Sequence, residues 1–240
     1  MLIKHTNFSK DLNEASTSFN ESENKIALIT GTSSGIGEAT AKLFLAMGFT
    51  VHGIDLLDTT IHDPKYHHYK MDILDIEHLP EIPELGYLIN NAGVQDSYDD
   101  IAINLKATID LTEKLAFQPS IKAVVNVSST SAHTGAEFPY YASSKGGLLT
   151  YTKNLADRLS VYGATANSVS PGGVITTLNH PVMSDKAKWS EIMKLTPLKK
   201  WATAAEIAQW IYFIAVMQNS MTGQDVVIDN GEMIKSNFVW

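Results

Sequence analysis

Residues Lys25–Gly37 read Lys-Ile-Ala-Leu-Ile-Thr-Gly-Thr-Ser-Ser-Gly-Ile-Gly, and this stretch decides the fold. Its apolar run, Ile26–Ile29, predicts a short strand that is buried on both faces. Three glycines follow, and a helical pattern begins at Ile36 and ends near Gly48. A strand, a glycine turn and a helix in this order leave unpaired amides at the helix N-terminus, where a phosphate can bind. The same turn also occurs without a ligand, so its meaning depends on the rest of the chain.

Composition and charge limit the classes of protein and partner. The chain has 240 residues, of which 44% are hydrophobic and 18% charged, and this suits one α/β domain with a substantial core. The formal net charge is −8 and no basic block stands out, so we expect no nucleic-acid partner and no anionic-membrane partner. The longest apolar run, Trp210–Met217, is too short to span a bilayer, and no secretory signal is evident. These features predict a soluble cytoplasmic protein.

Cysteine and histidine usage argues against thiol and metal chemistry. The chain has no cysteine, which excludes disulfides, thiolate metal sites and cysteine nucleophiles. Of the eight histidines, His62, His67 and His68 cluster, but no convincing set of partner ligands accompanies them. We therefore expect no metal site.

Strands and helices are expected to alternate along the chain. Strands are expected at residues 26–29, 49–55, 66–71, 87–89, 123–127, 164–170 and 225–228, of which 26–29 and 123–127 are the clearest apolar runs. Helical patterns predict helices at residues 36–48, 100–117, 141–162 and 204–217. The segment between residues 72 and 87 contains Pro80 and Pro83 and is too short for a full helix. Residues 1–24 are polar and predict an N-terminal arm, which Phe8, Leu12 and Phe19 can attach to the domain at 25–240 or to a neighbouring subunit.

Asp55 ends the second predicted strand, 18 residues after Gly37. A dinucleotide-binding fold places the acid that binds the adenosine ribose near this position. A carboxylate accepts hydrogen bonds from ribose hydroxyls and repels a 2′-phosphate, and no Arg or Lys lies in the glycine turn or just after Asp55. The sequence therefore favours NAD over NADP. The alternative is that Asp55 is only a turn residue at the end of a strand.

Tyr141 and Lys145 are four residues apart in a predicted helix, so their side chains share one helix face. A lysine ammonium group beside a phenol favours the phenolate and lowers its pKa from about 10 toward neutrality. Such a tyrosine can exchange a proton with an alcohol or a ketone. Tyr140 competes on chemical grounds, but its partner at the same spacing is Ser144. The pairing therefore selects Tyr141, although an isolated pair of this kind is more often a surface tyrosine beside a solvated lysine.

Small and polar residues follow the fourth and fifth predicted strands. Asn90–Gly93 suits a ligand crevice at the carboxyl end of a strand, and a simple turn explains it equally well. Ser128–Ser131 follows the fifth strand, where serines are usually caps and turns and become catalytic candidates only beside a partner such as Tyr141. Residues 177–200 mix apolar and polar side chains and predict a mobile lid over a pocket, with a structural helical excursion as the alternative.

These landmarks together resemble the classical short-chain dehydrogenase/reductase family. The matching motifs are Thr30-Gly31-x-x-x-Gly35-Ile36-Gly37, Asp55, Asp72, Asn90-Asn91-Ala92-Gly93, Asn104, Ser129, Tyr141-x-x-x-Lys145, Pro171-Gly172 and Thr222-Gly223-Gln224. The resemblance covers about Lys25 to Gly231. It implies a single doubly wound α/β domain of the Rossmann type with a seven-stranded parallel sheet. It also implies an NAD-dependent oxidoreductase for a small alcohol or ketone substrate, assembled as a homo-oligomer (a dimer or a tetramer).

The resemblance further implies the roles of individual residues. Tyr141 would exchange the proton, and Lys145 would lower the Tyr141 pKa and hold the nicotinamide ribose. Ser129 would bind the substrate oxygen, with Ser128 and Ser131 as rivals, and Asn104 would keep a water in a proton relay. The implied cofactor-binding residues are Gly31, Ser33, Ser34, Gly35, Ile36, Gly37, Asp55, Asp72, Ile73, Asn91, Ala92, Gly93, Tyr141, Lys145, Pro171, Gly172, Val174 and Thr176.

Two segments are shorter than the family usually has, namely 72–87 and 93–104. The second shortens the start of the helix that carries Asn104, a helix that commonly builds the subunit interface in this family. Two other functions stay open at this point. One is a 3-oxoacyl carrier-protein reductase using NADPH, which Asp55 disfavours, and the other is a catalytically silent nucleotide-binding protein.

Overall fold

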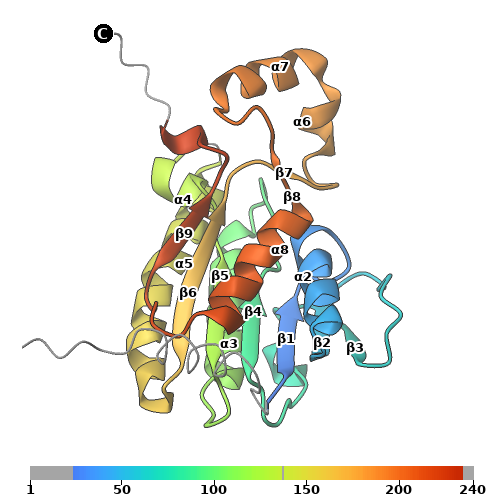
Figure 1. Cartoon of the computed structure of the whole chain (residues 1–240), viewed down its shortest axis with the longest axis vertical. Helices are drawn as coiled ribbons and strands as arrows, with labels where there is room; N and C mark the ends of the chain where they lie inside the picture. The colour runs from blue at the N-terminus through green and yellow to red at the C-terminus, as the bar shows by residue number, and fades with distance from the viewer. Residues whose placement is uncertain (1–23, 137, 235–240) are drawn as a thin grey trace, which may run out of the picture.

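The computed structural model describes residues 24–136 and 138–234. They form three layers, a parallel sheet with helices on each of its two faces (Figure 1). The strand order is β3-β2-β1-β4-β5-β6-β9, and each neighbouring pair is parallel. The strands are β1 (Ile26–Thr30), β2 (Thr50–Asp55), β3 (Tyr66–Lys70), β4 (Tyr87–Asn90), β5 (Ala123–Val127), β6 (Thr165–Pro171) and β9 (Asp225–Ile228). The predicted doubly wound α/β fold with a seven-stranded parallel sheet is confirmed. The predicted N-terminal arm falls, apart from Asn24, outside the described residues.

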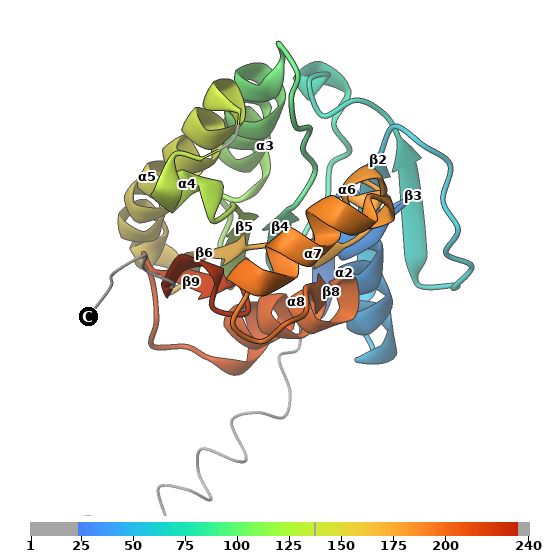
Figure 2. The same cartoon turned by 90° about the horizontal axis from the view of Figure 1, so that it is seen from above.

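Helices cover both faces of the sheet (Figure 2). One face carries α2 (Gly35–Ala46) and α8 (Ala204–Tyr212), which pack against each other, and the other carries α3 (Thr108–Leu115) and α5 (Pro139–Leu159). Three further helices, α4 (Ser131–Thr134), α6 (His180–Ser184) and α7 (Lys186–Leu195), lie near the carboxyl ends of the strands, with α6 and α7 on top (Figure 1). This arrangement leaves the strand ends to form the floor of a site.

The first strand is buried on both faces, as its apolar run predicts. Ala27 and Ile29 belong to the apolar layer beneath α2 and α8, whereas Leu28 points the other way into the layer beneath α3 and α5. In the first layer Phe44 and Phe49 meet edge to face, with ring centroids 4.9 Å apart. Burying each large apolar side chain contributes about 1.5–3 kcal/mol, so β1 and its two core layers fix the position of the turn that follows.

A buried row of polar side chains joins the sheet to the helices on one face. The Asn90 amide donates to Asn126 Oδ1 and to Thr112 Oγ1, each at 2.8 Å. The Asn126 amide in turn donates to Thr152 Oγ1 at 2.8 Å. Buried amides are tolerated when their hydrogen bonds are made, and a network of this kind specifies one arrangement of its elements. It holds β4 and β5 in register with α3 and α5.

For three connecting segments, the structure agrees with the sequence-based expectation to different degrees. The helix expected at 100–117 begins as a π-helix, η2 (Ile101–Ala107), and becomes α-helical at Thr108. A two-stranded sheet of β7 (Val174–Ile175) and β8 (Ala202–Thr203) was not predicted, because two-residue strands show no alternation. Between β3 and β4 the described chain forms only the 3-10 turn Ile76–His78, as the short segment predicted.

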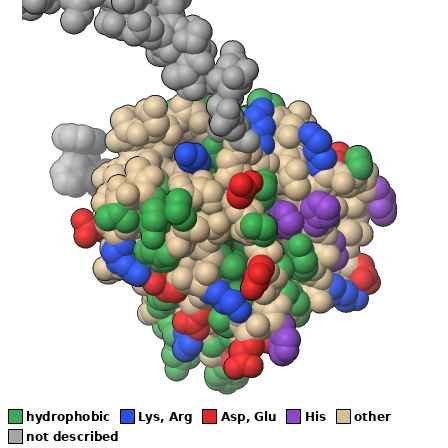
Figure 3. Space-filling view, turned by 90° about the horizontal axis from the view of Figure 1, so that it is seen from below, with side chains coloured by type: hydrophobic (Ala, Val, Ile, Leu, Met, Phe, Trp, Pro, Cys, Tyr) green, Lys and Arg blue, Asp and Glu red, His purple; other side chains and the backbone are tan. Residues whose placement is uncertain are grey.

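The face opposite the lid shows histidine side chains gathered toward one side (Figure 3). His52 of β2 and His67 of β3 stack with ring centroids 5.0 Å apart, and burial lowers the pKa of His52. In the described residues no group of three or more His, Asp or Glu side chains is placed to hold a metal ion. No helix in residues 24–136 and 138–234 has the length and apolarity needed to cross a membrane.

Candidate active site

The glycine turn after β1 leaves the first amides of α2 without a side-chain partner. Gly31 has a φ of +76°, a conformation that favours glycine. A β-carbon at Gly37 would lie 2.0 Å from the Gly31 carbonyl oxygen, so only glycine lets the helix start so close to the turn. Ser34 is the N-cap of α2, and its side chain makes no cap hydrogen bond within the described structure. The amides at this helix start therefore suit an anionic group such as a dinucleotide phosphate.

Thr30 and Asn91 clamp the turn to the end of β4. The Thr30 hydroxyl oxygen accepts hydrogen bonds from the amides of Asn91 and Ala92 at 3.0 and 2.9 Å. The Asn91 side-chain amide donates to the Thr30 carbonyl at 2.9 Å. Asn91, predicted as a cofactor-binding residue, thus shapes the turn as well as lining the cavity described below.

Asp55 holds the other end of the glycine turn. One carboxylate oxygen accepts from the Ser33 amide at 2.8 Å, and the other accepts from the Leu57 amide at 2.9 Å. Sequence reasoning missed a nearby cation, Lys70, because it lies on β3, opposite Asp55 in the strand register. The Lys70 ammonium is engaged by Asp58 at 2.8 Å.

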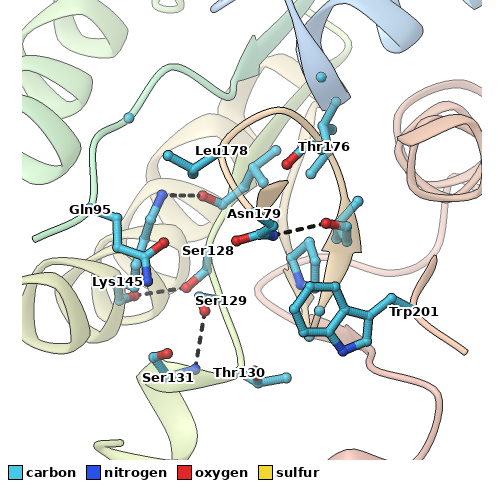
Figure 4. Close-up of a pocket in the computed structure, with 18 of the residues that line it drawn as sticks. Gln95, Ser128, Ser129, Thr130, Ser131, Lys145, Thr176, Leu178, Asn179 and Trp201 are labelled. Carbon is cyan, nitrogen blue, oxygen red and sulfur yellow. Dashed lines mark hydrogen bonds between the residues drawn. The ribbon is translucent and has the colours of Figure 1, made fainter. Parts of the chain in front are cut away.

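A cavity of about 540 Å³ opens at the carboxyl ends of β1, β4, β5 and β6, with Ile192 and Leu195 of α7 in its lining, and Figure 4 shows many of the residues that line it. Most of the predicted site residues line it: Gly31, Ser34, Gly35, Ile36, Asn91, Ala92, Gly93, Ser129, Tyr141, Lys145, Pro171, Gly172, Val174 and Thr176. Other predicted residues do not line it, namely Ser33, Gly37, Asp55, Asp72, Ile73 and Asn104. Of these, Ile73 packs in the apolar core, and Asp72 Oδ1 accepts from the Leu74 amide at 2.9 Å.

Tyr141 and Lys145 come from the first two turns of α5 and both line the cavity. The Lys145 ammonium lies 5.7 Å from the centroid of the Tyr141 ring and donates to the Val127 carbonyl at 2.9 Å. Burial lowers the pKa of Lys145 to about 8. Tyr140, the chemical competitor, is 56% exposed and does not line the cavity. The structure therefore brings together the pair that the four-residue spacing selected.

Asp100 is a fully buried carboxylate that sequence reasoning did not single out. Its Oδ1 accepts from the Ser97 amide at 3.3 Å, and its Oδ2 has no hydrogen-bond partner among the described residues. Its negative charge favours the charged form of Lys145 and so opposes the effect of burial on the pKa of Lys145. An aspartate at the start of a predicted helix is an ordinary dipole or capping residue, so nothing in the pattern marked it.

Asn104 lies in the π-helix η2 and is fully buried. Its side chain accepts from the Val94 amide and donates to the Val94 carbonyl, both at 2.8 Å, and donates to Ser144 Oγ at 3.1 Å. A β-carbon at Gly93 would lie 2.9 Å from Asn104 Oδ1 and 3.4 Å from Lys145 Nζ. The Asn104 side chain therefore fixes the strand-end segment beside Lys145, and its role in a water relay stays a prediction.

Two of the three serine candidates, Ser128 and Ser129, differ in how their hydroxyl groups are used. Ser128 Oγ donates to the Lys145 carbonyl at 2.9 Å, so its proton is committed to α5. Ser129 Oγ accepts from the Ser131 amide at 3.1 Å, which orients it as a donor toward a ligand (Figure 4). This geometry favours Ser129 over Ser128 as the group that meets a substrate oxygen.

The wall of the cavity formed by residues 177–200 and the chain after them contains functional candidates that the motifs did not reveal. Trp201 packs so closely on Gly173 that a β-carbon there would lie 2.0 Å from the indole, and it meets Trp189 of α7 edge-on at 4.9 Å. Glu232 also lines this wall, whereas Gln95 lines the cavity on the side of Lys145 (Figure 4). These residues come from four separate segments, so no local pattern groups them.

Comparison with known proteins gives consistent matches over most of the chain. A family profile described as enoyl-(acyl carrier protein) reductase matches residues 82–232. The 3-oxoacyl-(acyl-carrier-protein) reductase FabG of Thermotoga maritima is 30% identical over 88% of this chain and 99% of its own. The solved structure of 4-hydroxyisoleucine dehydrogenase complexed with NADH has a TM-score of 0.80 and 30% identity, covering 89% of this chain and 100% of that one. ElxO with NADP bound has a TM-score of 0.77 and 25% identity, covering 88% and 100%.

Proposed function

The chain belongs to the short-chain dehydrogenase/reductase family, and from that membership we propose that it transfers a hydride between NAD and a secondary alcohol or ketone. Family membership makes it an NAD(P)-dependent oxidoreductase that acts on CH–OH groups. The observation that carries the proposal is the pair of Tyr141 and Lys145 in one cavity with the glycine turn and Ser129.

The residues of the cavity fit a nicotinamide dinucleotide. The uncapped start of α2 and the side-chain-free surface of Gly31 and Gly35 suit its phosphates, and Val174 and Thr176 would lie along the nicotinamide end. When bound, the nicotinamide supplies the acceptor or donor of the hydride. All other steps belong to side chains of the chain itself.

In the oxidation direction, Tyr141 acts as the base. Ser129 donates a hydrogen bond to the substrate oxygen and holds it beside the phenol. The O–H bond of the substrate breaks, its proton moves to the Tyr141 oxygen, and a C=O bond forms as the hydride leaves the carbon. Lys145 supports this step because its positive charge stabilises the phenolate. Reduction runs the same steps in reverse, with Tyr141 as the acid.

NAD is proposed over NADP because of Asp55. A carboxylate at the end of β2 suits the ribose hydroxyls and repels a 2′-phosphate. The nearest described cation on β3, Lys70, is engaged by Asp58, which reduces its value as a phosphate partner. The segment at residues 177–200 is proposed to be a lid that closes over the substrate. A homo-oligomeric assembly and a cytoplasmic location stay predictions.

A second candidate is a 3-oxoacyl carrier-protein reductase using NADPH, and the match to FabG of Thermotoga maritima favours it. Asp55 argues against it on the cofactor, as above. A catalytically silent nucleotide-binding protein is the third reading, and the presence of Ser129, Tyr141 and Lys145 in one cavity argues against it.

A screen of alcohols and ketones with NAD(H) and NADP(H), read by absorbance of the reduced nicotinamide, tests the function. We expect turnover of at least one secondary alcohol with NAD and higher kcat/KM with NAD than with NADP. Turnover of 3-oxoacyl thioesters alone, with NADPH, would support the carrier-protein reductase instead. Binding of NAD with no turnover of any compound would support the silent protein.

A further inference from the structure

The substrate side of the cavity is the part lined by Gln95, Leu178, Asn179, Ile192, Leu195, Thr196, Trp201 and Glu232. Among the described residues that line the cavity, Lys145 and Glu232 alone carry a charged group. Lys145 lies across the cavity from Trp201 (Figure 4), is 5% exposed, and already donates to the Val127 carbonyl. The substrate side therefore offers a carboxylate and no cation within the described structure.

Glu232 is fixed to the cavity wall at the end of β6. Its Oε2 accepts from the Gly173 amide and its Oε1 accepts from the Thr196 hydroxyl, both at 3.3 Å. Burial raises the pKa of Glu232, so this wall already disfavours one negative charge. Behind it lies Asp229, whose carboxylate accepts from the amides of Gly231 and Met233 at 2.8 Å each. An anionic ligand group placed here would meet the Glu232 carboxylate, with the charge of Asp229 behind it.

None of the lysines at residues 177–200 lines the cavity, and the two at the end of this segment, Lys199 and Lys200, are engaged elsewhere. Lys199 donates to the carbonyls of Met193 and Lys194 at 2.9 and 3.0 Å, which caps the end of α7. Lys200 forms an ion pair with Glu206 of α8. Neither lysine lines the cavity, so their charges act at the outer surface of the protein.

The remaining groups of the substrate side are neutral hydrogen-bonding groups and apolar surfaces. The Asn179 amide donates to the Val174 carbonyl at 2.8 Å, and Asn179 lies between Gln95 and Trp201 (Figure 4). Neutral amides can both donate to and accept from hydroxyl groups, and Trp201 and Leu178 provide surface for C–H groups. This combination suits a short carbon chain that carries several hydroxyls.

We propose that the substrate is an uncharged polyhydroxy alcohol or its keto form, and that Glu232 selects it over the acid with the same carbon skeleton. The proposal rests on the function proposed above for the same cavity. A hydroxyl group can donate to Glu232, whereas a carboxylate or phosphate in its place would be desolvated beside a carboxylate, with no compensating cation among the described residues of the lining. Selection here is therefore by repulsion of the acid as well as by attraction of the polyol.

Matched pairs of polyol and acid test the proposal. We expect the wild-type protein to oxidise threitol and xylitol with kcat/KM at least about tenfold above threonate and xylonate, because a like charge in a partly buried site repels the acid. Glu232→Gln should raise kcat/KM for the acids about tenfold and change the values for the polyols less. Glu191→Gln, which removes the same charge from the exposed outer side of α7, should leave the difference in kcat/KM between polyol and acid (the gap) unchanged. Glu232→Asp, which keeps the charge, should keep most of the difference in kcat/KM between polyol and acid. Thermal unfolding checks that each variant is folded.

Three results would overturn the proposal: acids oxidised as well as polyols by the wild type, an unchanged gap in folded Glu232→Gln, or an equal effect of Glu191→Gln. If neither member of a pair is oxidised, calorimetry on the protein with NADH compares the affinity for the polyol with the affinity for the acid. Binding of the acid as tight as that of the polyol, or no binding of either, then overturns it. Failure of the proposed function differs from these outcomes, because NAD would bind and no alcohol of any charge would be oxidised.

Discussion

The two sides of the cavity are built in different ways. On the cofactor side, short polar side chains and backbone groups hold one another: Thr30 with Asn91, Asp55 with Ser33, and Lys145 with Val127. On the substrate side, larger side chains such as Ile192 and Leu195 project from α7, whose residues are all exposed or half-buried. The cofactor side is therefore fixed by many buried contacts, whereas α7 on the substrate side makes few.

This difference suggests how one scaffold can keep its chemistry while its substrate varies. Hydride transfer needs reacting atoms within about 3–3.5 Å of each other, so the cofactor side benefits from rigidity. A lid that makes few buried contacts can open and close, and can change its side chains, with little effect on the stability of the core. Changes on the cofactor side should therefore affect activity strongly, and changes in the lid should affect it weakly.

Replacing Tyr141 by Phe should have the largest effect. Removing the proton-exchanging hydroxyl is expected to lower kcat by about 10²–10⁴-fold, while NAD affinity measured by calorimetry stays nearly unchanged. Tyr140→Phe, which alters an exposed neighbour, should leave kcat unchanged. Retained activity in Tyr141→Phe would contradict the acid–base role.

Replacing Asp55 by Ala should affect cofactor binding next most strongly. The turn loses an acceptor for the Ser33 amide and the ribose loses its carboxylate partner, so the Kd for NAD should rise about tenfold. The preference for NAD over NADP should narrow, as measured by calorimetry with both cofactors. Asp58→Ala, which removes an exposed carboxylate nearby, should leave NAD affinity unchanged. A wild-type preference for NADP would show that Asp55 does not set the cofactor.

Replacing Asp100 by Asn should shift the pH dependence of activity. Lys145 is charged below its pKa of about 8, and its charge is lost as the pH rises through that value. Without the Asp100 carboxylate the pKa of Lys145 falls further, so the alkaline limb of kcat/KM should move to lower pH by about one unit. Asp99→Asn changes the same charge at an exposed neighbour and should leave the limb in place. An unchanged limb in Asp100→Asn would rule out this coupling.

Replacing Asp185 by Ala should have the smallest effect. Asp185 caps α7 by accepting from the amides of Ala187 and Lys188 at 3.0 and 3.1 Å. Loss of a cap costs about 1 kcal/mol locally, which should raise KM a few-fold while leaving Tm unchanged, because α7 contributes little to the core. Thr203→Ala removes the cap of α8, whose Ile207 and Ile211 are fully buried, and should lower Tm by about 2–4 °C. Equal Tm changes in the two variants would show that the lid is part of the cooperative core.

The centre of the sheet was predictable from sequence because β1, β4 and β5 are compact, mostly apolar runs that end at a turn. The positions of α2, α5 and α8 follow from the helical patterns between the strands. The π-helix η2 was not predictable, because its Ile101 and Leu105 fit an ordinary helix equally well. Sequence also left the fine structure of the lid open, since its residues show no clear apolar face.

Within the candidate site, the parts carried by a local motif were predictable and the parts assembled from distant segments were not. Tyr141 and Lys145 were selected by a spacing of four residues, and they line one cavity. Glu232 and Trp201 are separated by 31 positions in sequence and reach the same wall only through the folding of the lid and β9. Asp100 was overlooked because burial, and not residue type, gives it its electrostatic effect.

The clamp between Thr30 and Asn91 has a consequence for how the chain matures. The two ends of the clamp are 61 residues apart. The glycine turn therefore acquires its shape only after β4 has been synthesised and paired with β1. A nascent chain that ends before Asn91 lacks the bond that shapes this loop. The dinucleotide can therefore assist the late, and not the early, part of folding on the ribosome.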